Sequence, residues 1–273
     1  MCAYNVRIFD YEHSQQIRIY TKTVNEQNEI EKKQNEIKRK ERIEHEKNNA
    51  ENTENLPCDK DNLLQSETDI LRSQKVSVNR TKQSIYEITR SNTWDWFVTL
   101  TFDRNKIDSS DYDLLLKKTR KWLDNIKRRK CPDMKYIIVP ELHKDGMHYH
   151  FHGLFANCDG LEMEYSGVKQ NGKKVYNILD FKYGFSTATK VQDTKKVSSY
   201  ISKYITKDLE NHIKGKRRYI ASNNCKKAQI VDYLMTEDEI KTLIECVSDN
   251  ITHMKTQDIQ LAQQRIKYIE LKK

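Results

Sequence analysis

Three histidines at alternate positions, His148, His150 and His152, constrain this chain more than any other part of its 273 residues. Such alternation is typical of a β-strand, on which every second side chain lies on the same face. The three imidazoles would form a row on one face, while Tyr149 and Phe151 between them are available for packing. The segment therefore predicts a strand that carries titratable side chains on one side of a sheet.

A hairpin is predicted around this histidine row. Residues 135–139 form an apolar run that leads into Glu141, and residues 144–146 are a Lys-Asp-Gly turn. Two imidazoles two residues apart on a strand can bind one divalent metal ion, and Glu141 on the neighbouring strand could complete the ligand set. His143 shares the face of Glu141 and is a further candidate ligand or a partner of the ligands. The alternative is a structural or solvent-facing histidine row that binds no metal.

Downstream, the unit Tyr-x-x-Lys occurs twice. Tyr200 and Tyr204 are four residues apart and so lie on one face of a helix. Lys203 and Lys207 have the same spacing and lie on an adjoining stripe. A tyrosine hydroxyl with a pKa of ~10 is a poor nucleophile at neutral pH, but nearby cations favour the phenolate and can hold a phosphate. The arrangement suits attack on a phosphodiester; the alternative is an amphipathic helix whose tyrosines pack while its lysines reach solvent.

The rest of the pattern predicts a mixed α and β domain between flanking segments. Strands are expected at 96–102, 135–139, 148–155 and 185–191, helices at 111–129 and 194–209, and a polar loop or hairpin at 160–174. The predicted segments are a small β-hairpin at 1–22, a charged helical extension and linker at 23–92, a compact domain at 93–235 and a helical tail at 236–273. The tail opens with Thr236-x-x-Glu239, a capping box.

The positive charge of the chain has a location. Lys and Arg total 49 against 40 Asp and Glu, a net charge of +9, and residues 91–235 alone hold 27 basic and 17 acidic side chains. A basic central segment points to a polyanion as partner. Two basic clusters there are candidate phosphate contacts, with a solvated helix end and a solvated loop as the alternatives. The clusters are Lys127, Arg128, Arg129 and Lys130, and Lys214, Lys216, Arg217 and Arg218.

Several protein classes are disfavoured by the sequence. No apolar run approaches the ~20 residues of a membrane-spanning helix, and the first residues lack the apolar core of a signal peptide. The six scattered cysteines contain no Cys-x-x-Cys pair, which argues against a disulfide framework or a cysteine zinc site and fits a reducing cytoplasm. No Gly-x-x-x-x-Gly-Lys-Ser/Thr loop is present, so the chain carries no recognisable helicase of its own.

In their order along the chain, these motifs resemble the HUH endonucleases, specifically the rolling-circle replication initiator (Rep) proteins of small plasmids and phages. The resemblance covers roughly residues 94–235 and includes three motifs. They are Phe97-Val98-Thr99-Leu100-Thr101-Phe102, His150-Phe151-His152-Gly153-Leu154, and Tyr200-Ile201-Ser202-Lys203-Tyr204-Ile205-Thr206-Lys207. No single motif is specific, whereas the ordered set with the Glu-turn-His hairpin between is fairly so.

The resemblance implies a fold and a metal site. The family fold is α/β (α+β), a central and mainly antiparallel sheet flanked by helices in an RRM-like palm, here with a helical N-terminal extension and a C-terminal helix. His150 and His152 would bind Mg²⁺ or Mn²⁺, with Glu141 as the third ligand. His148 departs from the minimal motif, and His143 is the other alternative. We favour His150 and His152 because a bulky apolar residue lies between them and Gly-Leu follows.

The resemblance also implies an activity. Tyr200 or Tyr204 would be the nucleophile, and Lys203 or Lys207 its cationic companion, in metal-dependent nicking and joining of single-stranded origin DNA. The reaction would leave a 5′-phosphotyrosine link and a free 3′-hydroxyl that primes synthesis. The implied partners are single-stranded or hairpin origin DNA, a host helicase and a DNA polymerase in the bacterial cytoplasm, and no membrane; the oligomeric state stays open. The alternatives are a conjugative relaxase or HUH transposase, and a non-catalytic basic DNA-binding regulator.

Overall fold

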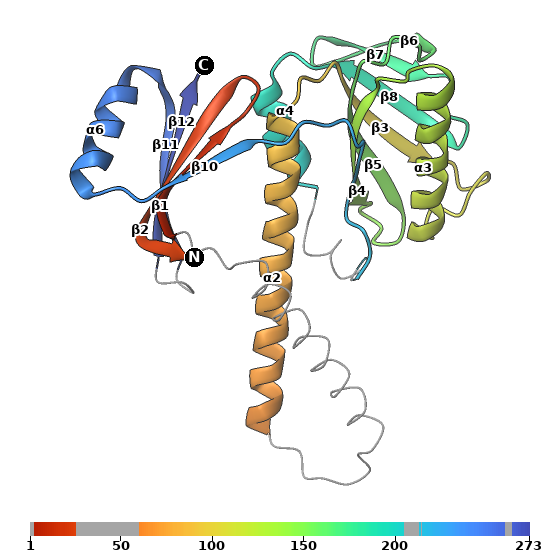
Figure 1. The fold of residues 1–273 in the computed structure, drawn as a ribbon. Coiled ribbons are helices and arrows are strands. Elements are labelled where there is room, and N and C mark those ends of the chain that lie inside the picture. The colour runs from red at the N-terminus through yellow and green to blue at the C-terminus, as the bar shows by residue number, and fades with distance from the viewer. Residues whose placement is uncertain (1–2, 26–59, 205–212, 214, 260–263) are drawn as a thin grey trace. The chain divides into compact units, whose positions relative to one another are not determined.

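The computed structural model describes residues 3–25, 60–204, 213, 215–259 and 264–273, which form an α+β protein (Figure 1). Two antiparallel sheets and four α-helices lie in these ranges, which confirms the predicted fold class. The chain forms two compact units: unit 1 is Met1–Leu71 with Gln229–Lys273, and unit 2 is Arg72–Ala228. None of the described helices is both long and apolar enough to cross a membrane.

Unit 2 is built on a seven-stranded sheet with the spatial order β6-β7-β8-β3-β5-β4-β9. Its strands are β3 (Trp96–Phe102), β4 (Lys135–Leu142), β5 (Tyr149–Ala156), β6 (Met163–Gln170), β7 (Lys173–Ile178), β8 (Gly184–Lys190) and β9 (Ile220–Ala221). Its helices are the part of α2 (Lys60–Arg90) from Arg72 onward, α3 (Tyr112–Arg129) and α4 (Thr194–Ser202). Each of the four predicted strands is present, and the polar segment 160–174 contributes to the β6–β7 hairpin.

The two faces of the unit 2 sheet differ in chemistry. On β3, which lies between β8 and β5, the buried side chains of one face are Val98, Leu100 and Phe102. Helix α3 covers this face, where the Trp122 ring contacts Phe155 of β5 at 6.2 Å between centroids. Thr99 and Thr101 lie on the opposite face and are only half-buried. The second face therefore keeps polar side chains that can do chemistry.

Helix α3 begins and packs as its sequence predicts. The Asp111 carboxylate accepts a hydrogen bond from the backbone N–H of Leu114 at 3.0 Å, which satisfies one of the donors left unpaired at a helix start. Its buried stripe recurs at helical spacing. The members are Tyr112, Leu115, Thr119, Trp122, Leu123 and Ile126.

Unit 1 contains a five-stranded sheet with the order β10-β1-β2-β12-β11. The strands are β1 (Ala3–Asp10), β2 (Ser14–Asn25), β10 (Gln229–Tyr233), β11 (Ile251–Ile259) and β12 (Gln264–Lys272). Helix α6 (Glu237–Val247), followed by the 3₁₀ turn η1 (Ser248–Asn250), contributes Ile240, Leu243 and Ile244 to a cluster around Val6 and Ile17. Early and late segments of the chain are thus joined in one sheet.

The tail beyond residue 235 is only partly the predicted helix. The capping box forms, since Glu239 N–H donates to the Thr236 hydroxyl at 3.3 Å and Thr236 N–H donates to the Glu239 carboxylate at 2.7 Å. Strands β11 and β12 were not expected from the sequence. Most side chains of β11 are exposed, so this strand lacks the apolar alternation that marks a half-buried strand. Pairing with β12, which pairs with β2, holds it in place instead.

Other predicted segments have mixed outcomes. The N-terminal hairpin forms as β1 and β2. Helix α4 ends at Ser202 rather than continuing to 209, and residues 205–212 lie outside the described ranges, as do residues 26–59 of the charged extension and linker. The structure divides the chain near residues 71 and 228, whereas the predicted segments divide it near 92 and 235.

Candidate active site

Both histidines of the predicted motif lie on the polar face of the unit 2 sheet. In the β3–β5 register, His150 is paired with Thr101 and His152 with Thr99. The Thr99 hydroxyl bonds Nδ1 of His152 at 3.1 Å, and the Thr101 hydroxyl bonds Nδ1 of His150 at 3.0 Å. The two threonines therefore orient both rings and point each Nε2 away from β3.

Glu141 joins the cluster from β4. It is paired in register with His150, but its Oε2 accepts a hydrogen bond from Nε2 of His152 at 2.6 Å. His152 is therefore held at both ring nitrogens, which is consistent with its burial. Glu141 and His150 are half-buried beside it. We call Glu141, His150 and His152 the histidine cluster.

Electrostatics favour the metal-binding forms of two of these groups. The hydrogen bond from His152 lowers the pKa of Glu141, and the charges of the neighbouring imidazoles lower it further. Burial lowers the pKa of His150, and the charges of His143 and His152 act in the same direction. At neutral pH, Glu141 is therefore ionised and His150 is neutral. Carboxylates and neutral imidazoles are the forms that bind metal ions.

The donor set of the histidine cluster fits a divalent cation. Two imidazoles and a carboxylate are ligands that Mn²⁺ accepts, and Thr99 and Thr101 are suitable outer partners for the rings. As the side chains stand, the described residues contain no group of three or more His, Cys, Asp or Glu arranged as a metal site. Binding a cation here would replace the hydrogen bond between His152 and Glu141 by coordination to both.

The other two histidines are engaged by the turn of the hairpin. Nδ1 of His148 lies 2.7 Å from Oδ2 of Asp145, and Nδ1 of His143 lies 3.1 Å from the same atom. Backbone N–H groups of Met147 and His148 donate to Asp145 and lower its pKa. His143 also stacks on His150, with ring centroids 4.9 Å apart. His143 is thus in contact with the histidine cluster, whereas His148 is paired with Asp145.

Helix α4 brings the predicted tyrosines to the same face. Ile201 is fully buried in the core of unit 2 and anchors the helix. Tyr200 lies in the last turn of α4, and Tyr204 follows its end. The Tyr204 ring stacks on His152 with centroids 3.8 Å apart and planes 8° apart. Tyr200 contacts Tyr204 at 5.3 Å and Phe97 of β3 at 5.6 Å between centroids, so both tyrosines belong to one aromatic group beside the histidine cluster.

The two tyrosines differ in their surroundings. Tyr200 is exposed, with 49% of its surface accessible, and Tyr204 is half-buried. Burial raises the pKa of Tyr204, and a hydrogen bond with Tyr200 and the charge of Glu141 raise it further. The described surroundings therefore favour the neutral phenol of Tyr204, where the sequence suggests cations that favour the phenolate. Lys203 is exposed, and Lys207 lies outside the described residues.

The basic cluster at the end of α3 divides into two kinds of side chain. Lys130 Nζ lies 2.6 Å from Glu162 and 2.7 Å from Asp180, so its charge is already paired. Two of the other three donate to asparagine side chains at 3.2 and 2.9 Å and keep their charge available to an anion, and the third is exposed. These three are Lys127, Arg128 and Arg129.

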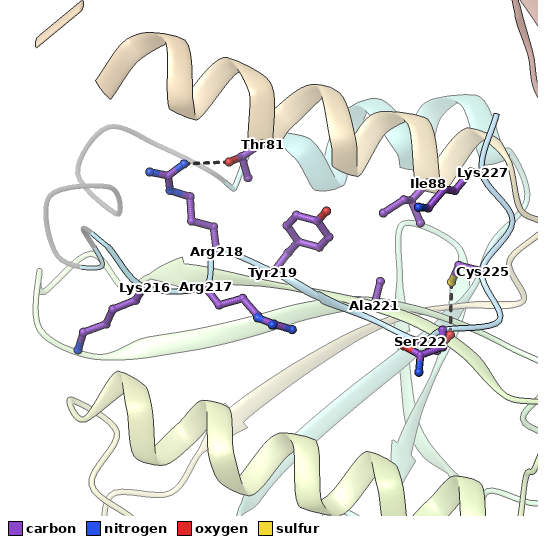
Figure 2. Close-up of a pocket in the computed structure, with 11 residues that line it drawn as sticks. Thr81, Ile88, Lys216, Arg217, Arg218, Tyr219, Ala221, Ser222, Cys225 and Lys227 are labelled. Atoms are coloured by element: carbon purple, nitrogen blue, oxygen red, sulfur yellow. Dashed lines mark hydrogen bonds between the residues drawn. The ribbon is translucent and has the colours of Figure 1, made fainter. Parts of the chain in front are cut away.

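The second basic cluster lines a pocket of about 550 Å³ between α2 and the segment that leads into β9 (Figure 2). Arg218 extends across it and donates to two hydroxyls of α2 at 2.8 and 2.9 Å. Lys216 is paired with Asp113 at 2.7 Å, and Arg217 also lines the pocket. Lys214 lies outside the described residues. The pocket shares no lining residue with the histidine cluster, so these basic side chains form a separate surface.

Three residues of the site have roles that the sequence did not predict. Thr99 and Thr101 orient the imidazoles, and Phe97 stacks on His152 at 5.8 Å between centroids. The spacing of the threonines contains a signal for their role. Two residues apart on one strand match two residues apart on an antiparallel neighbour, so Thr-x-Thr can meet His-x-His pair by pair.

Comparison with known families agrees with this site. Residues 95–209 match the model of a replication-associated protein family, the ORF2 type. The matched range includes β3, the histidine cluster, and both tyrosines. The match supports a replication initiator and, with it, DNA binding. No curated protein and no solved structure matches the chain.

Proposed function

We propose that unit 2 is a rolling-circle replication initiator that nicks and rejoins single-stranded origin DNA through a tyrosine. The stacking of Tyr204 on His152 carries the proposal, because it brings a nucleophilic side chain to a set of metal-binding donors. Transesterification of a phosphodiester needs both on the same side of the substrate. The replication-associated family match supports this role over a conjugative relaxase or transposase.

The histidine cluster would hold Mg²⁺ or Mn²⁺. When bound, the ion would polarise the scissile phosphate and offset the negative charge that develops in the transition state. Thr99 and Thr101 keep the two imidazoles in a fixed orientation for this purpose. Glu141 contributes a carboxylate that stays ionised because its pKa is lowered.

The tyrosine reaction would exchange one phosphoester bond for another. The phenolic oxygen bonds to phosphorus as the bond from phosphorus to the 3′-oxygen of the preceding nucleotide breaks. The phenolic proton is lost to solvent, and the departing 3′-oxygen takes one up. The products are a 5′-phosphotyrosine and a free 3′-hydroxyl, which can prime a polymerase. Because the new ester keeps the bond energy, later attack by a 3′-hydroxyl reseals DNA without ATP.

Two tyrosines allow one molecule to cleave twice, once to initiate and once to terminate. We assign the first cleavage to Tyr204, because its ring stacks on His152 and the charge of Glu141 raises its pKa. Tyr200 is hydrogen-bonded to it and more exposed, which suits attack on a second strand. Lys203 is exposed next to both and is available to the phosphate.

The proposed substrate is a single-stranded or hairpin segment of the origin, since a paired strand would not reach a site on a sheet face. Lys127, Arg128 and Arg129 are proposed contacts to the flanking phosphates. A host helicase would separate the strands, because no phosphate-loop motif is present in the sequence. A host polymerase would extend the free 3′-hydroxyl.

The test is a nicking assay on supercoiled DNA that carries the cognate origin, with Mn²⁺, followed by mass spectrometry of the protein–oligonucleotide adduct. We expect an adduct on Tyr204 or Tyr200 and no product in EDTA. The control variant is Tyr165→Phe, which changes an exposed tyrosine of β6. Nicking by the Tyr200→Phe/Tyr204→Phe double variant would exclude the tyrosine mechanism, and nicking in EDTA would exclude the metal. Origin binding without any nicking would leave the non-catalytic regulator.

A further inference from the structure

Phe185 is the most exposed large apolar side chain in the described part of the chain, with 71% of its surface accessible. It lies near the start of β8 in unit 2. A phenylalanine in this state forgoes the stabilisation that burial of its ring would bring. A single exposed apolar residue needs no explanation by itself, so its position has to decide whether it has a role.

The strand register places Phe185 on the same sheet face as the histidine cluster. Phe185 is paired with Thr101 across β8 and β3. Thr101 is in turn paired with His150, and His150 with Glu141. Side chains paired across an antiparallel ladder lie on the same face. The four therefore form one row across β8, β3, β5 and β4 (Figure 1), with Phe185 two strand spacings, ~10 Å, from His150.

The backbone beneath this ring is fixed. The Ser186 hydroxyl, buried on the opposite face, bonds the backbone N–H of Ile178 at 2.8 Å and its carbonyl at 3.3 Å. A Cβ atom at Gly184 would lie 2.1 Å from the carbonyl oxygen of Thr101, so β8 reaches β3 here only because glycine has none. The phenyl ring therefore stands on a strand that is tied to both of its neighbours.

The chemistry around Phe185 suits a nucleobase. Thr101 and Thr187, its neighbours on this face, carry hydroxyls and no charge. Aromatic side chains stack on any base, because every base has a π-face. A protein partner fits less well, since a lone ring on this row offers far less than the ~800 Å² per partner of a stable protein interface.

We propose that Phe185 stacks on a base of the single-stranded DNA and so positions the strand for attack by the tyrosines. The inference rests on the proposed nicking function and adds a positioning residue outside the metal and tyrosine groups. The stacked base lies within about three nucleotides of the scissile phosphate, because ~10 Å corresponds to about three nucleotides at ~3.4 Å of rise each.

The first experiment measures binding of full-length protein to a random-sequence single-stranded oligonucleotide of about 20 nucleotides, longer than the ~4–16 nucleotides of a typical site. Fluorescence anisotropy in EDTA reports affinity without cleavage. We expect Phe185→Ala to weaken binding about 5- to 100-fold, the effect of losing one stacked base, and Phe185→Tyr to retain affinity. The control is Tyr165→Ala, which removes an exposed aromatic ring from β6, on a strand two positions away.

The second experiment identifies the base. Nick-site oligonucleotides with a single abasic nucleotide are bound to the native protein and to Phe185→Ala. We expect one abasic position, within about three nucleotides of the nick, to lower the affinity of the native protein and not that of the variant. The KM for nicking should rise in Phe185→Ala more than kcat falls, which a folding defect would not produce.

Two results separate this inference from the proposed function. If the native protein nicks through a tyrosine while Phe185→Ala binds as tightly, or keeps the same abasic penalty, the role of Phe185 is overturned and the function stands. If the native protein neither nicks nor forms an adduct, the proposed function fails. In that case the random-sequence oligonucleotide alone decides: a loss of affinity in Phe185→Ala supports stacking, and equal affinity overturns it.

Discussion

The ring of Tyr204 lies parallel to the imidazole of His152, with centroids 3.8 Å apart and planes 8° apart. Thr99 and Glu141 hold that imidazole from opposite nitrogens, at 3.1 and 2.6 Å. The surface on which the tyrosine stacks is therefore fixed before any DNA binds. A preorganised first contact of this kind lowers the cost of bringing a nucleophile into position.

The proposed division of labour between the tyrosines can be tested by single substitutions. We expect Tyr204→Phe to lower the rate of the first cleavage at least about 100-fold, because the ring remains stacked while the attacking oxygen is lost. Tyr200→Phe should still make the first cut but fail to join the second strand. Single-turnover cleavage of a labelled nick-site oligonucleotide measures the first step, and a two-oligonucleotide strand-transfer assay measures the second. The reverse pattern would exchange the two roles.

The threonines that orient the imidazoles should matter for metal affinity. We expect Thr99→Val and Thr101→Val each to weaken Mn²⁺ binding about 10- to 100-fold, the range for loss of a residue that orients a ligand. Titration of nicking rate against Mn²⁺, together with calorimetry without DNA, measures the shift. Thr187→Val is the matched control, since Thr187 is paired with Thr99 on the same face and is exposed. Unchanged metal affinity in both variants would remove the threonines from the site.

The basic cluster after α3 should separate into side chains that contact phosphate and one that does not. We expect Lys127→Ala to reduce the slope of log affinity against log salt by about 0.7, the value for one phosphate contact to single-stranded DNA. Lys130→Ala should leave that slope unchanged, because its charge is paired with Glu162 and Asp180. Binding of a single-stranded oligonucleotide across a series of salt concentrations gives both slopes. Equal slopes for the two variants would count against this contact.

The stability of unit 1 should depend on its capping box. Thr236→Ala removes the hydroxyl that accepts from Glu239 N–H, and we expect a loss of ~1 kcal/mol in the free energy of unfolding. Thr242→Ala, an exposed position inside α6, is the control and should change stability by less than ~0.5 kcal/mol. Urea unfolding followed by circular dichroism measures both. A loss no larger at Thr236 than at Thr242 would show that the cap contributes little.

Much of unit 2 could be predicted because its signals are local. The aromatic and β-branched run at 96–102 and the helical spacing at 111–129 each specify one element, and both formed within a residue of the expected bounds. The alternate histidines specify a strand face for the same reason. Glu141 was identified from its position at the end of a strand that a short turn joins to the histidine strand.

The remaining features depend on pairing between distant segments. Neither Thr99 nor Phe185 stands out in the sequence, and only the register of β3 with its two neighbours relates them to the histidine cluster. Strand β11 is almost wholly exposed, so its sequence carries no burial pattern. The raised pKa of Tyr204 depends on burial and on contact with Tyr200, and a motif cannot report either.

The sheet of unit 1 imposes an order on folding during synthesis. Strand β2 is hydrogen-bonded to β12, which is translated only after the whole of unit 2 has been made. Translation of the 45 residues from Gln229 to Lys273 takes about 2 to 9 s at ~5–20 residues per second, long enough for a small domain to fold. The nascent chain would therefore complete the proposed nicking unit while β1 and β2 still wait for their partners. Ribosomes that stop early would release a folded unit 2 with exposed strand edges, a species prone to aggregation.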